Sequence, residues 1–204
     1  MKTHFIQLLT HPNHAWTDIR TEEEQQPRHY LAHLLLWALV PSVCLFIGLT
    51  WVGWSLAETD RVKLSGASAL QLSILLYLAI LIGTTIMGGF IRWMSRSFEA
   101  RPTLNQCIGF AAYTATPYFM AGITGLYPSR WLAVAALGVA GAYATYLLFV
   151  GLPKFMRIIQ NRGLLYAASV WGVGVLVLVT ILVSMILFWL NVMEPTYLRP
   201  TTLP

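Results

Sequence analysis

The chain has 204 residues, of which 57% are apolar and only 10% are charged, and its formal net charge at pH 7 is +5. A water-soluble domain carries about 25% charged residues, so this composition excludes a soluble globular protein. The sequence therefore predicts an all-α, polytopic membrane protein.

Five long stretches contain no Asp, Glu, Lys or Arg, and they cover residues 29–57, 64–91, 102–129, 131–153 and 163–193. A helix that crosses a hydrocarbon core of ~30 Å needs about 20 residues at 1.5 Å each, and every stretch supplies that number. We predict a bundle of five transmembrane helices within residues 30–193. Their expected cores are residues 34–54, 70–90, 107–126, 131–150 and 165–190.

Residues 1–29 precede the first predicted helix. Apolar residues at 5–9, and then Trp16 and Ile19, recur at helix-like spacing on either side of Pro12. Segments of this kind lie flat at the membrane interface. We expect a cytoplasmic interfacial segment that anchors the chain, with docking of a cytoplasmic protein as the alternative. The three glutamates at 22–24 are expected to form a solvated connector.

The third predicted helix has the most polar content. Pro117 lies near its centre, so the carbonyl of Tyr113 loses a hydrogen bond and a kink is expected. Hydroxyl-bearing residues at such a place either pack helices together or line a polar cavity. We favour packing, with a cavity or a hinge as the alternative. The candidate residues for either role are Gly109, Phe110, Tyr113, Thr114, Thr116 and Pro117.

The loop at residues 153–162 contains three cations and no acid, with apolar residues between them. This composition predicts a short basic amphipathic element that contacts anionic lipid through Lys154, Arg157 and Arg162. After the last predicted helix, residues 194–204 are expected to form a short external tail.

Lys and Arg divide unequally between the two predicted sides of the membrane. One side carries nine: Lys2, Arg20, Arg28, Arg92, Arg96, Arg101, Lys154, Arg157 and Arg162. The other side carries four: Arg61, Lys63, Arg130 and Arg199. Cytoplasmic loops are enriched in these residues, so we predict a cytoplasmic N-terminus and an external C-terminus. This asymmetry also accounts for the positive net charge, and no nucleic-acid partner is expected.

The predicted helix cores contain no Asp, Glu, Lys or Arg, so groups for proton-coupled transport or hydrolysis are missing there. All five histidines lie in the first 33 residues, with no HExxH motif and no cysteine beside them, so we expect no metal and no cofactor. These absences favour a non-enzymatic membrane organiser or scaffold that acts through helix–helix and cytoplasmic-tail contacts. Its expected partners are the lipid bilayer and either a second copy or another membrane protein.

Two alternatives to the scaffold remain. The first is a channel or carrier for a neutral or lipid-like solute, with a cavity around Pro117. The second is an intramembrane enzyme, which ranks third because a nucleophile would have no base in the predicted helix cores.

Four segments resemble the Yip family, especially its small bacterial inner-membrane members. They are PNHAWTDI at 12–19, GFAAYTATPYFMAG at 109–122, GAYATYLLFVGLPKFM at 141–156 and YAASV at 166–170. The resemblance covers about residues 12–190 and implies five transmembrane helices with a cytoplasmic N-terminus. It gives emphasis to Gly109, Phe110, Tyr113 and Pro117 but brings no catalytic role. Similar eukaryotic proteins bind Rab-type GTPases in vesicle trafficking. Their long hydrophilic N-terminal region is absent here, so that role is not expected.

Overall fold

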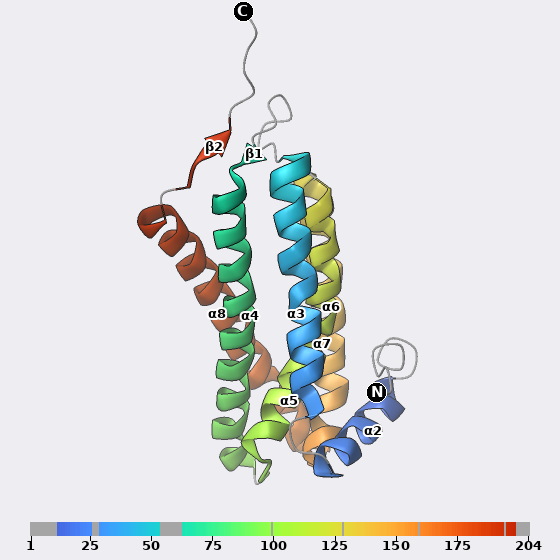
Figure 1. Ribbon diagram of the computed structural model, residues 1–204. Helices are drawn as coiled ribbons and strands as arrows, with labels where there is room; N and C mark the ends of the chain where they lie inside the picture. The colour runs from blue at the N-terminus through green and yellow to red at the C-terminus, as the bar shows by residue number, and fades with distance from the viewer. Residues whose placement is uncertain are drawn as a thin grey trace, which may run out of the picture.

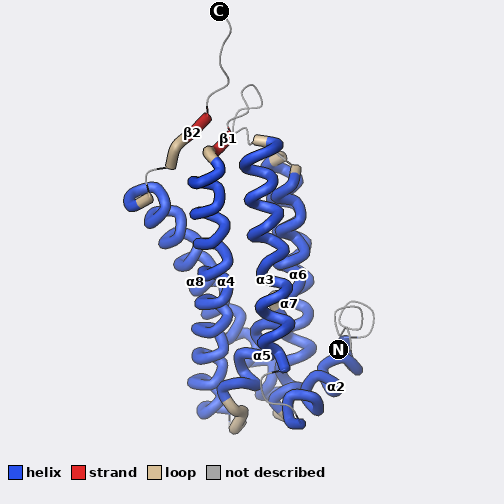
Figure 2. Tube along the Cα trace, in the orientation of Figure 1, coloured by secondary structure: helices blue, strands red, loops and turns tan. Residues whose placement is uncertain are grey.

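The computed structural model describes residues 12–25, 29–53, 63–98, 100–127, 129–158, 160–193 and 195–198. Its α-helices are α2 (Pro12–Gln25), α3 (His29–Ile47), α4 (Gly66–Ser95), α5 (Leu104–Thr114), α6 (Thr116–Ala121), α7 (Arg130–Met156) and α8 (Gln160–Val192). Shorter elements are the π-helical turn η1 (Gly48–Val52), the 3₁₀ turns η2 (Arg96–Phe98) and η3 (Gly122–Leu126), and the strands β1 (Lys63–Leu64) and β2 (Tyr197–Leu198). The predicted all-α class is confirmed, and Figure 2 shows that the strands are short additions at one end.

The long helices run side by side between two ends of the bundle, as Figure 1 shows. Helix α2 lies across one end, close to α5, and we call this the α2 end. The strands β1 and β2 lie at the opposite end, the β end. The predicted interfacial residues 5–9 and residues 199–204 of the predicted tail lie outside the described residues.

Within the described residues, four helical segments are long and apolar enough to cross a membrane: His29–Val52, Gly66–Phe98, Arg130–Met156 and Arg162–Val192. They match four of the five predicted spans. The remaining one, predicted over 107–126 with a kink at Pro117, is not one continuous α-helix, because the chain divides at Ala115 into α5, α6 and η3. Pro117 lies in the first turn of α6, where a proline without an N–H is tolerated, instead of inside a longer helix.

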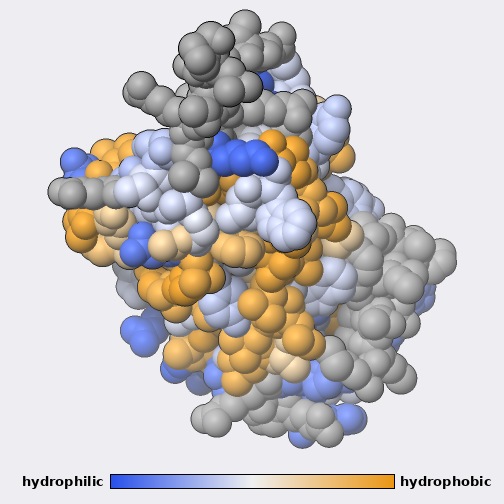
Figure 3. Space-filling view, turned by 45° about the horizontal axis from the view of Figure 1, so that its top comes forward, coloured by the Kyte–Doolittle hydropathy of each residue, from blue (hydrophilic) through white to orange (hydrophobic). Residues whose placement is uncertain are grey.

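The outward-facing sides of the bundle are apolar. In Figure 3, apolar side chains cover much of the visible side, and hydrophilic ones gather toward the ends. Helix α8 is the most exposed span, with Leu176 67% exposed, and it leans away from α3 and α7 toward the β end (Figure 1). Apolar outer faces on helices with internally satisfied backbones are what a hydrocarbon solvent requires.

At the β end, part of the predicted C-terminal tail forms β2 and pairs with β1, the strand just before α4. Lys63 lies opposite Leu198, and Leu64 opposite Tyr197, in an antiparallel ladder. The Thr196 N–H donates to Ser68 Oγ at 3.1 Å, which adds a side-chain tie to the same contact. The chain that follows α8 is thereby connected to the start of α4, whereas the middle of α8 packs on α4 directly, with Gly83 beside Ile181.

Glycines allow η3, which follows α6, to approach α3 and η1 closely. A Cβ at Gly122 would lie 2.7 Å from Pro41 Cα, and one at Gly48 would overlap the carbonyl oxygen of Gly125. In the absence of a hydrophobic driving force between apolar helices in lipid, such close backbone approach is a main source of attraction. The interface between α3 and η3 therefore depends on residues without side chains.

Candidate functional site

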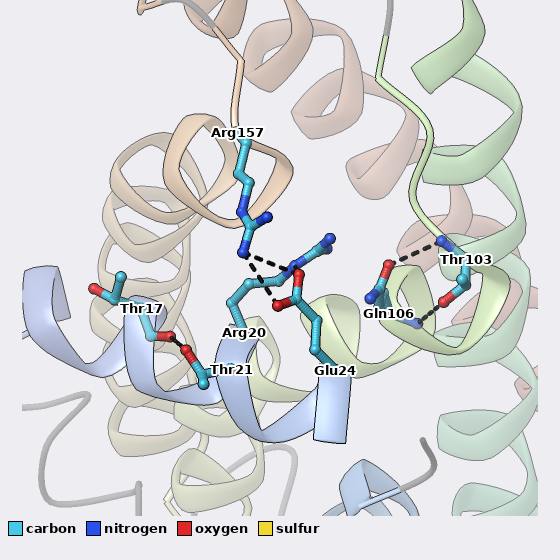
Figure 4. Close-up of polar contacts among 7 residues, drawn as sticks. All are labelled: Thr17, Arg20, Thr21, Glu24, Thr103, Gln106 and Arg157. Atoms are coloured by element: carbon cyan, nitrogen blue, oxygen red, sulfur yellow. Dashed lines mark hydrogen bonds and ion pairs between the residues drawn. The ribbon is translucent and has the colours of Figure 1, made fainter. Parts of the chain in front are cut away.

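Helix α5 is the central helix of the α2 end. A capping box starts it: the Thr103 N–H donates to Gln106 Oε1 at 2.9 Å, and the Gln106 N–H donates to Thr103 Oγ1 at 3.3 Å (Figure 4). These bonds satisfy backbone N–H groups that have no partner within the helix, so the first turn of α5 can be buried against neighbouring elements. Every residue from 106 to 114 is buried. Gly88 on α4 makes room, since a Cβ there would lie 2.7 Å from Ile108 Cα.

Gly109 and Phe110, two of the predicted candidates, face different neighbours. A Cβ at Gly109 would lie 3.3 Å from Tyr30 Cβ and 3.5 Å from Glu23 Oε1, so Gly109 lies against the end of α2 and the start of α3. The Phe110 ring is fully buried, 4.8 Å from the Trp16 ring and 5.3 Å from the Phe155 ring. The aromatic centre thus joins α2, α5 and α7.

Trp16 was not among the candidates from the sequence, yet its side chain is 0% exposed. A Cβ at Gly151 of α7 would lie 2.8 Å from Trp16 Cδ2, so the indole lies directly on the α7 backbone. Ala15 and Ile19 are also buried, so the apolar side of α2 packs on its own bundle. The apolar stripe was visible in the sequence, but a stripe alone does not say whether lipid, a partner or the same chain covers it.

Tyr113 and Thr116 meet His33 from α3. The His33 ring lies 4.5 Å from the Tyr113 ring, and His33 Nε2 shares a hydrogen bond of 3.0 Å with Thr116 Oγ1. All three side chains are buried. From the sequence, His33 was only one of five histidines in the first 33 residues, with no predicted link to the third helix. The hydrogen bond between His33 and Thr116 therefore joins α3 to the start of α6, next to the break at Ala115.

The break itself lies at Ala115, two residues before Pro117. The Tyr118 N–H donates to the Ala115 carbonyl at 3.0 Å, which starts the new helix α6. Pro117 is half-buried, and the adjacent Thr114 hydroxyl is buried with no hydrogen-bond partner among the described residues. The six candidates therefore line a continuous buried strip along α5 and the start of α6, not a single pocket.

The three glutamates at 22–24 belong to α2, and the predicted solvated connector is wrong for Glu23. That side chain is only 3% exposed, and Glu23 Oε1 accepts the Tyr30 N–H at 2.9 Å. The bond satisfies a donor at the start of α3, where backbone N–H groups have no partner within the helix. A buried carboxylate can thus serve as a helix cap contributed from a different element.

Glu24 holds α2 to the turn between α7 and α8. Arg20 Nε lies 2.9 Å from Glu24 Oε1, and Arg157 Nη2 lies 3.0 Å from the same oxygen (Figure 4). The hydrogen bond from Arg20, followed by the nearby charges of Arg20 and Arg157, holds the pKa of Glu24 below its usual value. Arg20 also lies over the Phe155 ring, 5.3 Å from its centroid. Arg157, predicted as a lipid contact, is therefore engaged with α2.

The segment at 153–162 differs from the predicted amphipathic loop. Helix α7 continues to Met156, Arg157 has a left-handed backbone (φ 55°), and α8 begins at Gln160. Phe155 is fully buried in the aromatic centre, so it is unavailable to lipid. Lys154 and Arg162 are exposed at the α2 end. Lipid contact by these cations stays a prediction.

The strip around α5 is rich in packing contacts and contains few reactive groups. Within the described part of the chain, no three His, Cys, Asp or Glu side chains gather as a metal site requires. What the arrangement can do chemically is hold four elements, α2, α3, α5 and α7, in one fixed relation through aromatic and hydrogen-bonded contacts.

Known proteins are similar to this chain over most of its length. The Yip1 domain family model matches residues 6–191. The chain is 39% identical over 187 residues to inner membrane protein YohC of Escherichia coli strain K12, covering 92% of this chain and 96% of YohC. The YohC of Escherichia coli O6:H1 strain CFT073 matches with the same identity and coverage. No solved structure matches the chain. A family match over most of the length, together with a relative of this identity, shows that this membrane protein belongs to the Yip1 domain family.

Proposed function

We propose that this chain is a non-enzymatic protein of the bacterial inner membrane that organises other membrane components through its helices and its α2 end. The observation that supports a scaffold is the filled interior around α5. Trp16, Phe110 and Phe155 occupy the space between α2, α5 and α7 with no exposure. A carrier needs a polar cavity that reaches the middle of the membrane, whereas a scaffold needs a rigid, filled bundle. YohC, by its name an inner membrane protein, supports the location.

We further propose that α5, α6 and η3 together form a fifth crossing. Residues 104–126 contact α4 through Gly88 near the α2 end and η1 through Gly48 near the β end. About 23 residues at 1.5 Å each span roughly 34 Å, enough for the hydrocarbon core. Five crossings place the N-terminus in the cytoplasm and the C-terminus outside, with the α2 end facing the cytoplasm by its excess of Lys and Arg.

Reporter fusions test this topology. A reporter active only outside the cytoplasm should give signal when fused after Thr201 and none when fused before Lys2. Signal at both ends would contradict an odd number of crossings, and the reverse pattern would contradict the orientation.

Site-specific photo-crosslinking in native membranes tests the scaffold. A crosslinker placed at exposed Leu176 of α8 or exposed Ile82 of α4 should yield a discrete protein adduct at one of the two faces. The same probe at buried Phe110 is the matched control and should yield none. If lipid is the sole adduct at every outward position tested along the spans, the scaffold is contradicted.

A carrier for a neutral or lipid-like solute is the second candidate, and the break at Ala115 favours it. Discontinuous helices beside buried polar groups, here the Thr114 hydroxyl and the His33–Thr116 bond, are common at transport sites. Reconstituted protein should be compared with empty vesicles for glycerol permeation and for exchange of a fluorescent lipid between leaflets. We expect no difference. A saturable flux that Pro117→Ala abolishes without unfolding the protein would replace the scaffold by the carrier.

A further inference from the structure

A hollow lined by arginines lies where α4 ends and α5 begins, at the α2 end of the bundle. Its volume is about 600 Å³, and it is lined by Arg92, Ser95, Arg96, Ala100, Arg101, Pro102 and Thr103. The cations at 154–162, which lie at the end of α7, in the turn after it and in the first turn of α8, are not among its lining residues. In the sequence these arginines indicated only the orientation of the chain in the membrane, with no site assigned to them.

The hollow has a concentrated positive charge. All three guanidinium side chains are exposed, and none of them forms an ion pair within the described part of the chain. In contrast, Arg20 and Arg157 at the same end are both paired with Glu24. Residues 92–103 contain a single acid in the sequence, Glu99, which lies outside the described residues, so the segment has a formal charge of +2.

The backbone around the hollow is held in place by its own hydrogen bonds. Ser95 Oγ donates to the Arg92 carbonyl, at 2.6 Å, and the Ala100 N–H donates to the Ser95 carbonyl at 3.1 Å. Thr103 begins the 11-residue helix α5 through the capping box. The positive end of that helix dipole therefore faces the same hollow as the guanidinium groups, and both favour an anion with several acceptor oxygens.

The surroundings indicate that the anion belongs to a lipid. Trp93 is 68% exposed and Phe90 38% exposed, and both lie on α4 within one turn of Arg92. The apolar outer face of α4 continues from there along the span, with Ile86 and Ile82 exposed. An acyl chain can lie along this face while its headgroup enters the hollow. A free phosphate would gain nothing from that apolar path.

From this arrangement we propose that the hollow lined by Arg92, Arg96 and Arg101 is a binding site for the phosphate of an anionic phospholipid. A planar guanidinium group can donate two hydrogen bonds to the oxygens of one phosphate, and among the described residues no carboxylate competes for these three groups. The site does not depend on whether the bundle acts as a scaffold or a carrier, since it requires only a bilayer at the α2 end.

Native mass spectrometry of the full chain in detergent tests the proposal, with phosphatidylglycerol, phosphatidylcholine and inorganic phosphate as separate probes. We expect one phosphatidylglycerol per chain to be retained well above phosphatidylcholine, and no competition by millimolar phosphate. The double variant Arg96→Gln with Arg101→Gln should weaken phosphatidylglycerol binding by about 30-fold, because each cation contributes about one factor of five. Both side chains are exposed, so the melting temperature should be unchanged.

The matched control is Lys63→Gln with Arg130→Gln, which removes the same charge at the β end. It should keep the retained lipid. Equal weakening in both double variants would show a general charge effect and overturn the site, as would unchanged binding in Arg96→Gln with Arg101→Gln. Full displacement of the lipid by inorganic phosphate would assign the hollow to the free ion instead. If the double variant fails to fold, Arg96→Gln alone, in η2, should still lower the affinity, and no decrease would refute the proposal.

Discussion

Replacement of Trp16 by alanine is the sharpest test of how the α2 end is built. The indole is fully buried, with the Phe110 ring 4.8 Å and the Phe155 ring 6.0 Å away. Burial of up to ~250 Å² at ~25 cal/mol per Å² corresponds to about 6 kcal/mol, of which the alanine retains a part. Truncation of large buried aromatic residues costs about 3–5 kcal/mol. We therefore expect Trp16→Ala to lower the free energy of unfolding by about 3–5 kcal/mol.

The measurement is reversible unfolding of the purified protein in mild detergent, followed by the fluorescence of its remaining tryptophans. Trp51→Ala is the matched control, because its side chain is 77% exposed in η1 and removal should cost less than about 1 kcal/mol. If Trp16→Ala and Trp51→Ala have the same effect, α2 is not packed on the bundle as described, and the aromatic centre is wrong.

A double-mutant cycle with Gly151 isolates the contact itself. Gly151→Ala would place its Cβ 2.8 Å from Trp16 Cδ2, so it should destabilise the protein by about 1–3 kcal/mol through overpacking. In the Trp16→Ala background the space is open, and the same change should be nearly neutral. Additive effects of the two substitutions would show that the residues do not touch.

Two further predictions concern α5 and the ion pair of α2. Gly109→Leu should destabilise the fold by about 1–3 kcal/mol, because the leucine side chain would clash with Tyr30. Pro117→Ala should cost less than about 1 kcal/mol, because Pro117 lies in the first turn of α6. Melting curves of both variants measure these effects. Since the pKa of Glu24 is lowered from its ordinary 4.5, its stabilising contribution is present above pH 4.5 and is lost as the pH falls through the folded value. The stability difference between wild type and Glu24→Gln should therefore shrink on acidification, and a constant difference would contradict the ion pair.

Much of the fold follows from local patterns in the sequence. A membrane span is a local property, because about 20 apolar residues without charge are required whatever the neighbours are. Four of the predicted spans are therefore found where expected, from the one beginning at His29 to the one ending at Val192. The candidate residues on α5 and α6 were selected because a proline among hydroxyl residues is unusual in a span, and their functional role stays a prediction.

The exact position of the helix break could not be predicted from the sequence. A proline inside an apolar stretch allows a mild kink, a full break or a new helix start. Here the chain breaks at Ala115, and the His33 bond to Thr116 and the fit of Gly122 against Pro41 hold the second piece. Those contacts join residues that are about 80 positions apart, and single-sequence periodicity carries no information about them.

The sequence by itself determined that the chain lies in a membrane, where its long spans are, and which loops carry the positive charge, because the bilayer acts on each segment separately. Only the tertiary structure decided which apolar residues face the interior. Phe110 is fully buried and Val139 is 72% exposed, yet both are apolar residues in apolar stretches. In lipid, the outer face of a helix is as apolar as its packed face, so hydropathy cannot distinguish them. The insertion of Trp16 and the burial of Glu23 were hidden for a different reason, because they depend on what the folded chain places beside them.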